Sequence, residues 1–129
     1  MDTGINSFNV IICGSREFQD YNLLKEKCDY YLSKRISSGQ KVVVISGGAR
    51  GADSLGERYA KERGLECKVF PADWDRYGKS AGYRRNVVMA EIGNACIAFL
   101  SGYSENKGTK SMISLARRSH LLVREVLDE

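Results

Sequence analysis

The stretch VVVISGGARGADSLGERYA, residues 42–60, decides the fold of this chain. It begins with a run of β-branched residues that is apolar on both faces, as in a strand covered on both sides of a parallel sheet. Beyond the glycines, a stripe with helical spacing follows, formed by Ala52, Leu55, Gly56, Tyr59 and Ala60. Gly64 is a typical C-terminal stop for that helix. The stretch therefore predicts a strand, a glycine-rich loop and a helix.

The same alternation continues on both sides of this unit. We expect strands at 8–13, 41–46, 66–70, 95–100 and 121–126. Further helices are expected after an N-cap at Asp20, over 81–92 and over 109–119, and residues 1–7 are expected to be a loose lead-in. Strict alternation requires right-handed crossovers and an open parallel sheet. The predicted fold is α/β: one Rossmann-like, doubly wound domain over residues 1–129, with a five-stranded parallel sheet and helices on both faces.

The composition excludes several classes of protein. The chain has 129 residues, of which 43% are hydrophobic and 28% charged, as in an ordinary globular domain. No apolar run approaches the roughly 20 residues of a membrane span, and the start has no signal-peptide pattern, so we expect a cytoplasmic protein without membrane contact. Four scattered cysteines predict reduced thiols, and a single histidine disfavours zinc and serine hydrolases. The net charge of +4 is modest and includes no basic tail.

The glycine-rich loop is the first candidate site, because ligands of doubly wound sheets lie beyond the carboxyl ends of the strands. Glycines at such a junction let a ligand approach the main chain, and the N–H groups of the new helix attract anions. Gly47, Gly48 and Gly51 therefore predict a phosphate site, in which a side chain at position 48 would displace the anion. Arg50 is suited to bidentate contact with phosphate. Asp53 is either a cap of the helix or an acceptor for a ribose hydroxyl.

The sequences of two other loops do not match known phosphate-binding motifs. Gly14 stands alone after the first strand, so the dinucleotide motif G-x-G-x-x-G is missing. In GYSENKGTKS, residues 102–111, Thr109 precedes Lys110 and the P-loop order fails, which disfavours an ordinary nucleoside triphosphatase. Gly108 and Thr109 are still expected to start a helix, with the Thr109 hydroxyl as N-cap and backbone donors for an anion.

The segment FPADWDRYGKSAGYRRNVVMAE, residues 70–91, has more aromatic and basic residues than a connector needs. Trp74 either stacks on a base or covers the core, and packing is the favoured alternative for a lone tryptophan. Asp73 and Asp75 are favoured as backbone caps over metal ligands, so neither a metal nor a cofactor is expected. Arg85 and Asn86, near a helix start, are either solvated or contact a ligand.

Taken together, five motifs resemble the YspA-like, cpYpsA-related family of the SLOG superfamily. GSREF, SGGARGADSLGERYA, FPADW, GKSAGYRRNVVMAE and GTKSMI occur in this order between Val10 and Val126. The resemblance implies a Rossmann-type fold, a bacterial or phage source, a homodimer, and a pocket for a nucleotide or a derivative such as ADP-ribose or NAD. By position, it implies that the pocket is lined by Gly14, Ser15, Arg16, Gly47, Gly48, Arg50, Gly51, Asp53, Arg85, Asn86, Gly108 and Thr109.

The preferred function is binding of a small nucleotide derivative, with a sensor as one form that such a protein takes, and two alternatives stay open. The first is an enzyme that cleaves an N-glycosidic or phosphoribosyl bond. Phosphoribohydrolase relatives carry P-G-G-x-G-T-x-x-E, whereas Lys110, Ser111 and Met112 follow Thr109 here, with no acid. Such chemistry needs a carboxylate to stabilise positive charge at the anomeric carbon, and the substitutes are Glu17, Asp53 and Glu57.

The second alternative is single-stranded DNA binding, since SGGARGAD also resembles the DNA-processing protein A family. A groove for DNA would be flanked by cations, and the candidates are Arg16, Arg50, Lys79, Arg84, Arg85 and Lys110. Trp74 and Tyr77 aside, aromatic residues for base stacking are sparse, which makes nucleic acid the less favoured partner.

Overall fold

A computed structural model describes residues 7–102 and 106–128, so most of the expected lead-in lies outside the described residues. Five parallel strands form one sheet in the order β3-β2-β1-β4-β5. The strands are β1 Phe8–Gly14, β2 Val42–Ser46, β3 Glu66–Val69, β4 Ala95–Ser101 and β5 Leu122–Asp128. The α/β, Rossmann-like fold with a five-stranded parallel sheet is thus confirmed.

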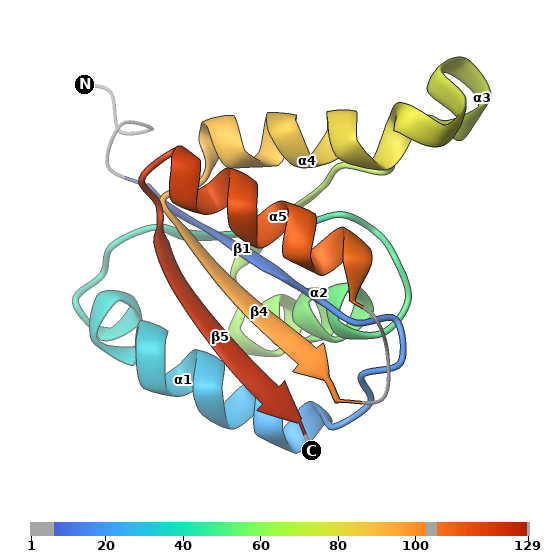
Figure 1. Ribbon diagram of the computed structural model, residues 1–129. Helices are drawn as coiled ribbons and strands as arrows, with labels where there is room; N and C mark the ends of the chain where they lie inside the picture. Colours follow the sequence, from blue (N-terminus) through green and yellow to red (C-terminus); the bar gives the residue numbers. More distant parts are fainter. Residues whose placement is uncertain (1–6, 103–105, 129) are drawn as a thin grey trace.

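Helices cover both faces of the sheet (Figure 1). α1 (Tyr21–Ser37) and α2 (Ala52–Arg63) pack on one face, and α4 (Ala81–Ile92) and α5 (Lys107–Arg118) pack on the other. Alternate residues of the central strand belong to the two separate cores: Val10 and Ile12 face α1 and α2, whereas Ile11 and Cys13 face α4 and α5. A strand buried on both faces has no polar side, which explains the unbroken apolar runs of the sequence.

The helix boundaries follow local capping. The Asp20 side chain accepts a hydrogen bond from Leu23 N at 3.0 Å, and Gly64 ends α2 in the left-handed conformation, both as predicted. α5 begins two residues earlier than predicted, at Lys107, with Asn106 as its N-cap. The prediction that Thr109 is the N-cap is therefore wrong, and Thr109 lies in the first turn of the helix.

A short helix that the sequence pattern did not indicate lies between β3 and α4. It comprises α3 (Trp74–Tyr77) and the 3-10 turn η2 (Gly78–Ser80). Asp73 caps α3, since its Oδ1 accepts from Arg76 N at 3.2 Å, which confirms capping for that residue. Figure 1 shows α3 projecting past the sheet, beside the end of α4 that lies on the same side as the start of α5. Within 7–102 and 106–128, no helix is long and apolar enough to cross a membrane.

Candidate functional site

A cavity of about 670 Å³ opens beyond the carboxyl end of β1, where the first turns of α2, α4 and α5 meet. This volume lies within the range of small-molecule pockets. The sheet changes its order of connection between β1 and β4, which is the switch point where doubly wound folds bind ligands. Nine of the twelve residues predicted for the pocket line this cavity: Gly14, Ser15, Arg16, Arg50, Asp53, Arg85, Asn86, Gly108 and Thr109.

The three glycines of the second loop do not line the cavity. A Cβ at Gly48 would point toward Val69, 3.0 Å from its Cγ1, and the Gly48 N–H donates to Ser46 Oγ at 3.1 Å. The expectation that a side chain at Gly48 would take the place of a bound anion is therefore wrong. Gly47 is buried against Arg85 and Asp53.

Asp53 occupies the position in the second loop that the sequence suggested for phosphate. Its Oδ2 accepts a hydrogen bond from Ala49 N at 3.2 Å, and the side chain is buried. Burial raises the pKa of Asp53 to about 6, although the N–H of Ala49 and the charge of Arg85 act in the opposite direction. The negative charge beside these amides is thus the protein's own carboxylate. Its bond goes to Ala49 in the loop before the N-cap Gly51, and α2 has no side-chain cap, so the predicted cap of the helix by Asp53 is not formed. A contact of Asp53 with a ribose hydroxyl stays a prediction.

Gly51 brings the first loop against the start of α2. A Cβ at this position would lie 2.3 Å from Ser15 O, and Gly51 has a φ of +80°. The N–H of Ala52 donates to the same Ser15 carbonyl at 3.2 Å. Because only glycine permits this approach, Gly51 places Ser15 and Arg16 beside Arg50 without contacting the cavity itself.

Arg85 is a structural centre of the site. Its guanidinium donates to Gly47 O, to Phe70 O at 3.4 Å and to Asn86 Oδ1 at 2.9 Å. Burial lowers the pKa of Arg85, and the nearby carboxylate of Asp53 raises it. Asn86 is buried, and its Nδ2 donates weakly to Gly108 O at 3.4 Å. Arg85 therefore ties α4 to the second loop and to the segment after β3.

Exposed cations and an unpartnered hydroxyl face the same cavity. Arg16, Arg50 and Lys107 are exposed cavity residues, and Arg50 pairs with Glu17 at 3.3 Å on the surface. Thr109 is 7% exposed and lines the cavity, and its hydroxyl has no hydrogen-bond partner among the described residues. Because every fully enclosed side-chain oxygen of the described residues has a partner, the Thr109 hydroxyl must be accessible from the cavity. This part of the cavity is suited to an anionic or hydroxyl-bearing ligand.

The favoured packing role of Trp74 is wrong. No residue of α3 is buried, and Trp74 is 53% exposed while lining the cavity, as does Tyr83, which is 52% exposed. A helix of four residues is too short to show a periodic pattern, so nothing in the local pattern favoured an exposed Trp74 over a packed one. Glu17, named in the sequence only as a substitute carboxylate, also lines the cavity. Other lining residues that sequence reasoning missed are Cys13, Ala49, Gly82, Met89, Asn106, Lys107, Ser111 and Met112.

The three candidate carboxylates for bond cleavage are placed differently. Glu17 and Asp53 line the cavity. Glu57 does not, and its Oε2 accepts from Ser46 Oγ at 2.7 Å. Among the described residues, no group of three His, Cys, Asp or Glu side chains is placed to bind a metal ion. Only Glu17 and Asp53 therefore have access to a ligand in this cavity.

Comparison with known proteins gives three matches. The family model described as "YspA, cpYpsA-related SLOG family" matches residues 8–77. The Gene 61 protein of Mycobacterium phage D29 is 33% identical over 120 residues, which make up 88% of this chain and 92% of that protein. The X-ray structure of DNA processing protein A (DprA) from Streptococcus pneumoniae has a TM-score of 0.66 at 15% identity. That match covers 95% of this chain and 51% of the DprA chain, so this chain spans about half of DprA and shares its fold.

Proposed function

This chain belongs to the YspA, cpYpsA-related SLOG family, and we propose a function on that premise. We propose that the cavity binds a nucleotide or a nucleotide derivative of the ADP-ribose or NAD type, and that the protein acts as a sensor of this ligand. Membership of the family supports binding of a nucleotide or a nucleic acid in general. The observation that carries the proposal is the cavity itself, since residues from four separate loops meet there with the unpartnered Thr109 hydroxyl and three exposed cations.

We assign the phosphate groups of the ligand to the side of the cavity formed by the first loop and the start of α5. Arg16 and Arg50 supply charge there, and the N-terminal turn of α5 supplies a favourable dipole. Thr109 would donate its hydroxyl to a phosphate oxygen. Arg85 and Asp53 have a supporting role, because their hydrogen bonds hold in place the loops that carry these groups.

The placement of the cations favours a small ligand over single-stranded DNA. Of the six cations considered for a DNA groove, Lys79, Arg84 and Lys110 do not line the cavity. The remaining three converge on a concave site of small-molecule size rather than extending along a strand. We further propose that residues 1–129 act as one domain, in the cytoplasm and without a cofactor. We also propose that two copies form a homodimer, and light scattering would measure the mass of that assembly.

A thermal-shift panel with ADP-ribose, NAD, AMP and short oligonucleotides tests the proposal. A ligand at about 100 times its Kd adds roughly 2.7 kcal/mol to stability, which is easily detected. We expect at least one of the small ligands to raise Tm. A shift produced by oligonucleotides alone would exclude the small-ligand proposal in favour of DNA binding.

Thr109→Val tests the assigned phosphate side. The Thr109 hydroxyl has no partner in the described protein, so we expect Tm without ligand to stay unchanged. Loss of one hydrogen bond to a charged oxygen should raise the Kd of the ligand about tenfold or more, and calorimetry measures this change. Ser114→Ala removes an exposed hydroxyl of the same helix outside the cavity and serves as control. Equal affinity of the two variants would contradict the assignment.

A specific observation also favours a second candidate, hydrolysis of an N-glycosidic bond. Asp53 is a buried carboxyl group in the cavity, and its pKa of about 6 is suited to donating a proton near neutral pH. In that case, chromatography after incubation with AMP or NAD should reveal released base with the wild type and none with Asp53→Asn. Absence of released base with the wild type would exclude the enzyme and leave the binding protein.

A further inference from the structure

We infer that the cavity contains a nucleobase subsite formed by Trp74 and Tyr83, so that its ligand must carry an aromatic base and not only a sugar phosphate. The inference rests on the proposed function, because it names the other half of the ligand whose phosphates are assigned above. Its evidence is separate from that assignment, since it comes from α3 and the first turn of α4.

The exposure of the indole is the first observation. Trp74 is 53% exposed although it is the most apolar large side chain of its segment, and α3 buries none of its residues in the core. An exposed indole gains free energy when a flat apolar surface covers it. Trp74 is among the residues that line the cavity, so a ligand there can contact the indole.

The position of the ring is the second observation. An added Cβ at Gly82 would lie 3.4 Å from Trp74 Cη2, so the edge of the indole approaches the main chain of α4 at a residue that has no side chain. Tyr83, next in the chain, is 52% exposed and lines the same cavity. Two exposed aromatic residues, one on α3 and one in the first turn of α4, thus line the same cavity.

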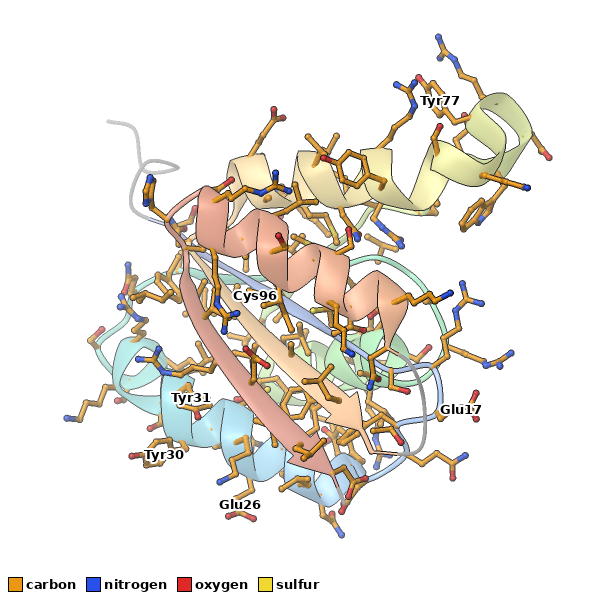
Figure 2. All side chains as sticks on the ribbon, in the orientation of Figure 1. Glu17, Glu26, Tyr30, Tyr31, Tyr77 and Cys96 are labelled. Atoms are coloured by element: carbon orange, nitrogen blue, oxygen red, sulfur yellow. The ribbon has the colours of Figure 1, made fainter. Side chains whose placement is uncertain are left out.

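The third observation is that polar and aromatic residues of the lining come from different segments of the chain. Figure 1 shows that α3 overhangs the side of the molecule on which α5 starts, and Figure 2 places Tyr77 on α3 and Glu17 in the loop after β1 on this same side. Arg16, Lys107 and Thr109 form the polar part of the lining, and Trp74 and Tyr83 form the aromatic part. A nucleoside phosphate has the same division, whereas a sugar phosphate lacks the aromatic half.

Intrinsic fluorescence gives a direct test, because Trp74 is the one tryptophan of the chain. AMP and ADP-ribose are titrated against ribose 5-phosphate, which has the same phosphorylated sugar as AMP but no base. We expect the two base-bearing probes to quench Trp74 fluorescence. Ribose 5-phosphate should bind more weakly and leave the fluorescence unchanged.

Trp74→Ala should lower the affinity for AMP or ADP-ribose by roughly 5- to 150-fold in calorimetry, because one stacking contact with the base is lost. It should leave the affinity for ribose 5-phosphate unchanged, and Trp74→Phe should restore most of the loss. The control is Tyr30→Ala, which removes an aromatic ring that is 78% exposed on α1, on the side of the molecule away from α3 (Figure 2).

The possible results separate this inference from the proposed function. If AMP or ADP-ribose binds the wild type without quenching and Trp74→Ala binds it equally well, the subsite is excluded and the nucleotide proposal stands. If Trp74→Ala weakens ribose 5-phosphate as much as AMP, the residue supports the loop and not the base, which also overturns the inference. If neither these probes nor the NAD of the thermal-shift panel binds the wild type, the proposed function fails and the subsite fails with it.

Discussion

Gly51→Ala is expected to destabilise the protein by about 3 kcal/mol or more, which for a domain of this size lowers Tm by roughly 10 °C. The new Cβ would lie 2.3 Å from Ser15 O and 2.6 Å from Arg16 O. Both atoms belong to a main chain that is held in place, because Ser15 O accepts hydrogen bonds from Ala52 N at 3.2 Å and from Phe18 N at 3.2 Å. The first loop can therefore yield only by giving up these bonds, and thermal unfolding measures the cost.

The matched control is Gly64→Ala. Gly64 also has a positive φ, +69°, but no atom lies within 4 Å of an added Cβ. Its replacement should cost only about 1 kcal/mol, the price of a left-handed conformation for a residue with a side chain. The difference between the two variants isolates the close contact of the first loop with α2. If Gly51→Ala unfolds no more easily than Gly64→Ala, that contact does not limit stability.

The fold could be predicted because its signals are local and repeated. Unbroken apolar runs in β1, β2 and β4 identify strands covered on both faces, and strict alternation with helices leaves few topologies. The edge strands β3 and β5 are largely exposed, yet their place in the alternation was enough to identify them. α3 was missed because four residues held by the Asp73 cap show no periodicity.

The site was predicted in location but not in its internal contacts. The rule that ligands lie beyond the carboxyl ends of the strands places the loops after β1 and β2 and the starts of α4 and α5 together. A glycine-rich loop signals exposed amides, but the sequence does not show which acceptor satisfies them. Here Asp53, four residues after Ala49, reaches back to the loop, so a carboxylate of the chain takes the position expected for phosphate. Trp74 and Thr109 were identified as residues of interest, but their access to the cavity depends on long-range packing.

Arg85→Met is expected to cost about 1 to 3 kcal/mol of stability at about pH 8, the range for leaving a hydrogen-bonding group without its partner, here made larger by the loss of a charged donor. The substitution leaves Gly47 O, Phe70 O and the Asn86 side chain without the donor that each has in the wild type. It also removes the positive charge that favours the ionised form of the buried Asp53. Arg85→Lys should rescue little, because an ammonium group cannot reproduce the planar fork that reaches three acceptors.

The part of this cost that comes from Asp53 depends on pH. An aspartate has a pKa of about 4 in an unfolded chain, whereas that of Asp53 in the fold is about 6. Between these values the folded protein binds the proton more readily, so the contribution of Asp53 to stability falls as pH rises through this window. Without Arg85 the pKa of Asp53 rises further and the fall continues to higher pH. The destabilisation by Arg85→Met should therefore be smaller at about pH 5 than at about pH 8.

Asp53→Asn separates the charge from the lost hydrogen bonds. It keeps an oxygen that can accept from Ala49 N but carries no charge, so its stability should not fall between about pH 4 and pH 6 as that of the wild type does. In the Asp53→Asn background, Arg85→Met should cost less at about pH 8 than in the wild type, because no buried carboxylate is left unpaired. Denaturant unfolding of the four proteins at both pH values gives the coupling directly. The losses in free energy of unfolding of the two single variants could instead add up in the double variant, or Arg85→Met could have an equal effect at the two pH values. Either result would mean that Arg85 acts through its carbonyl contacts alone and does not offset the charge of Asp53.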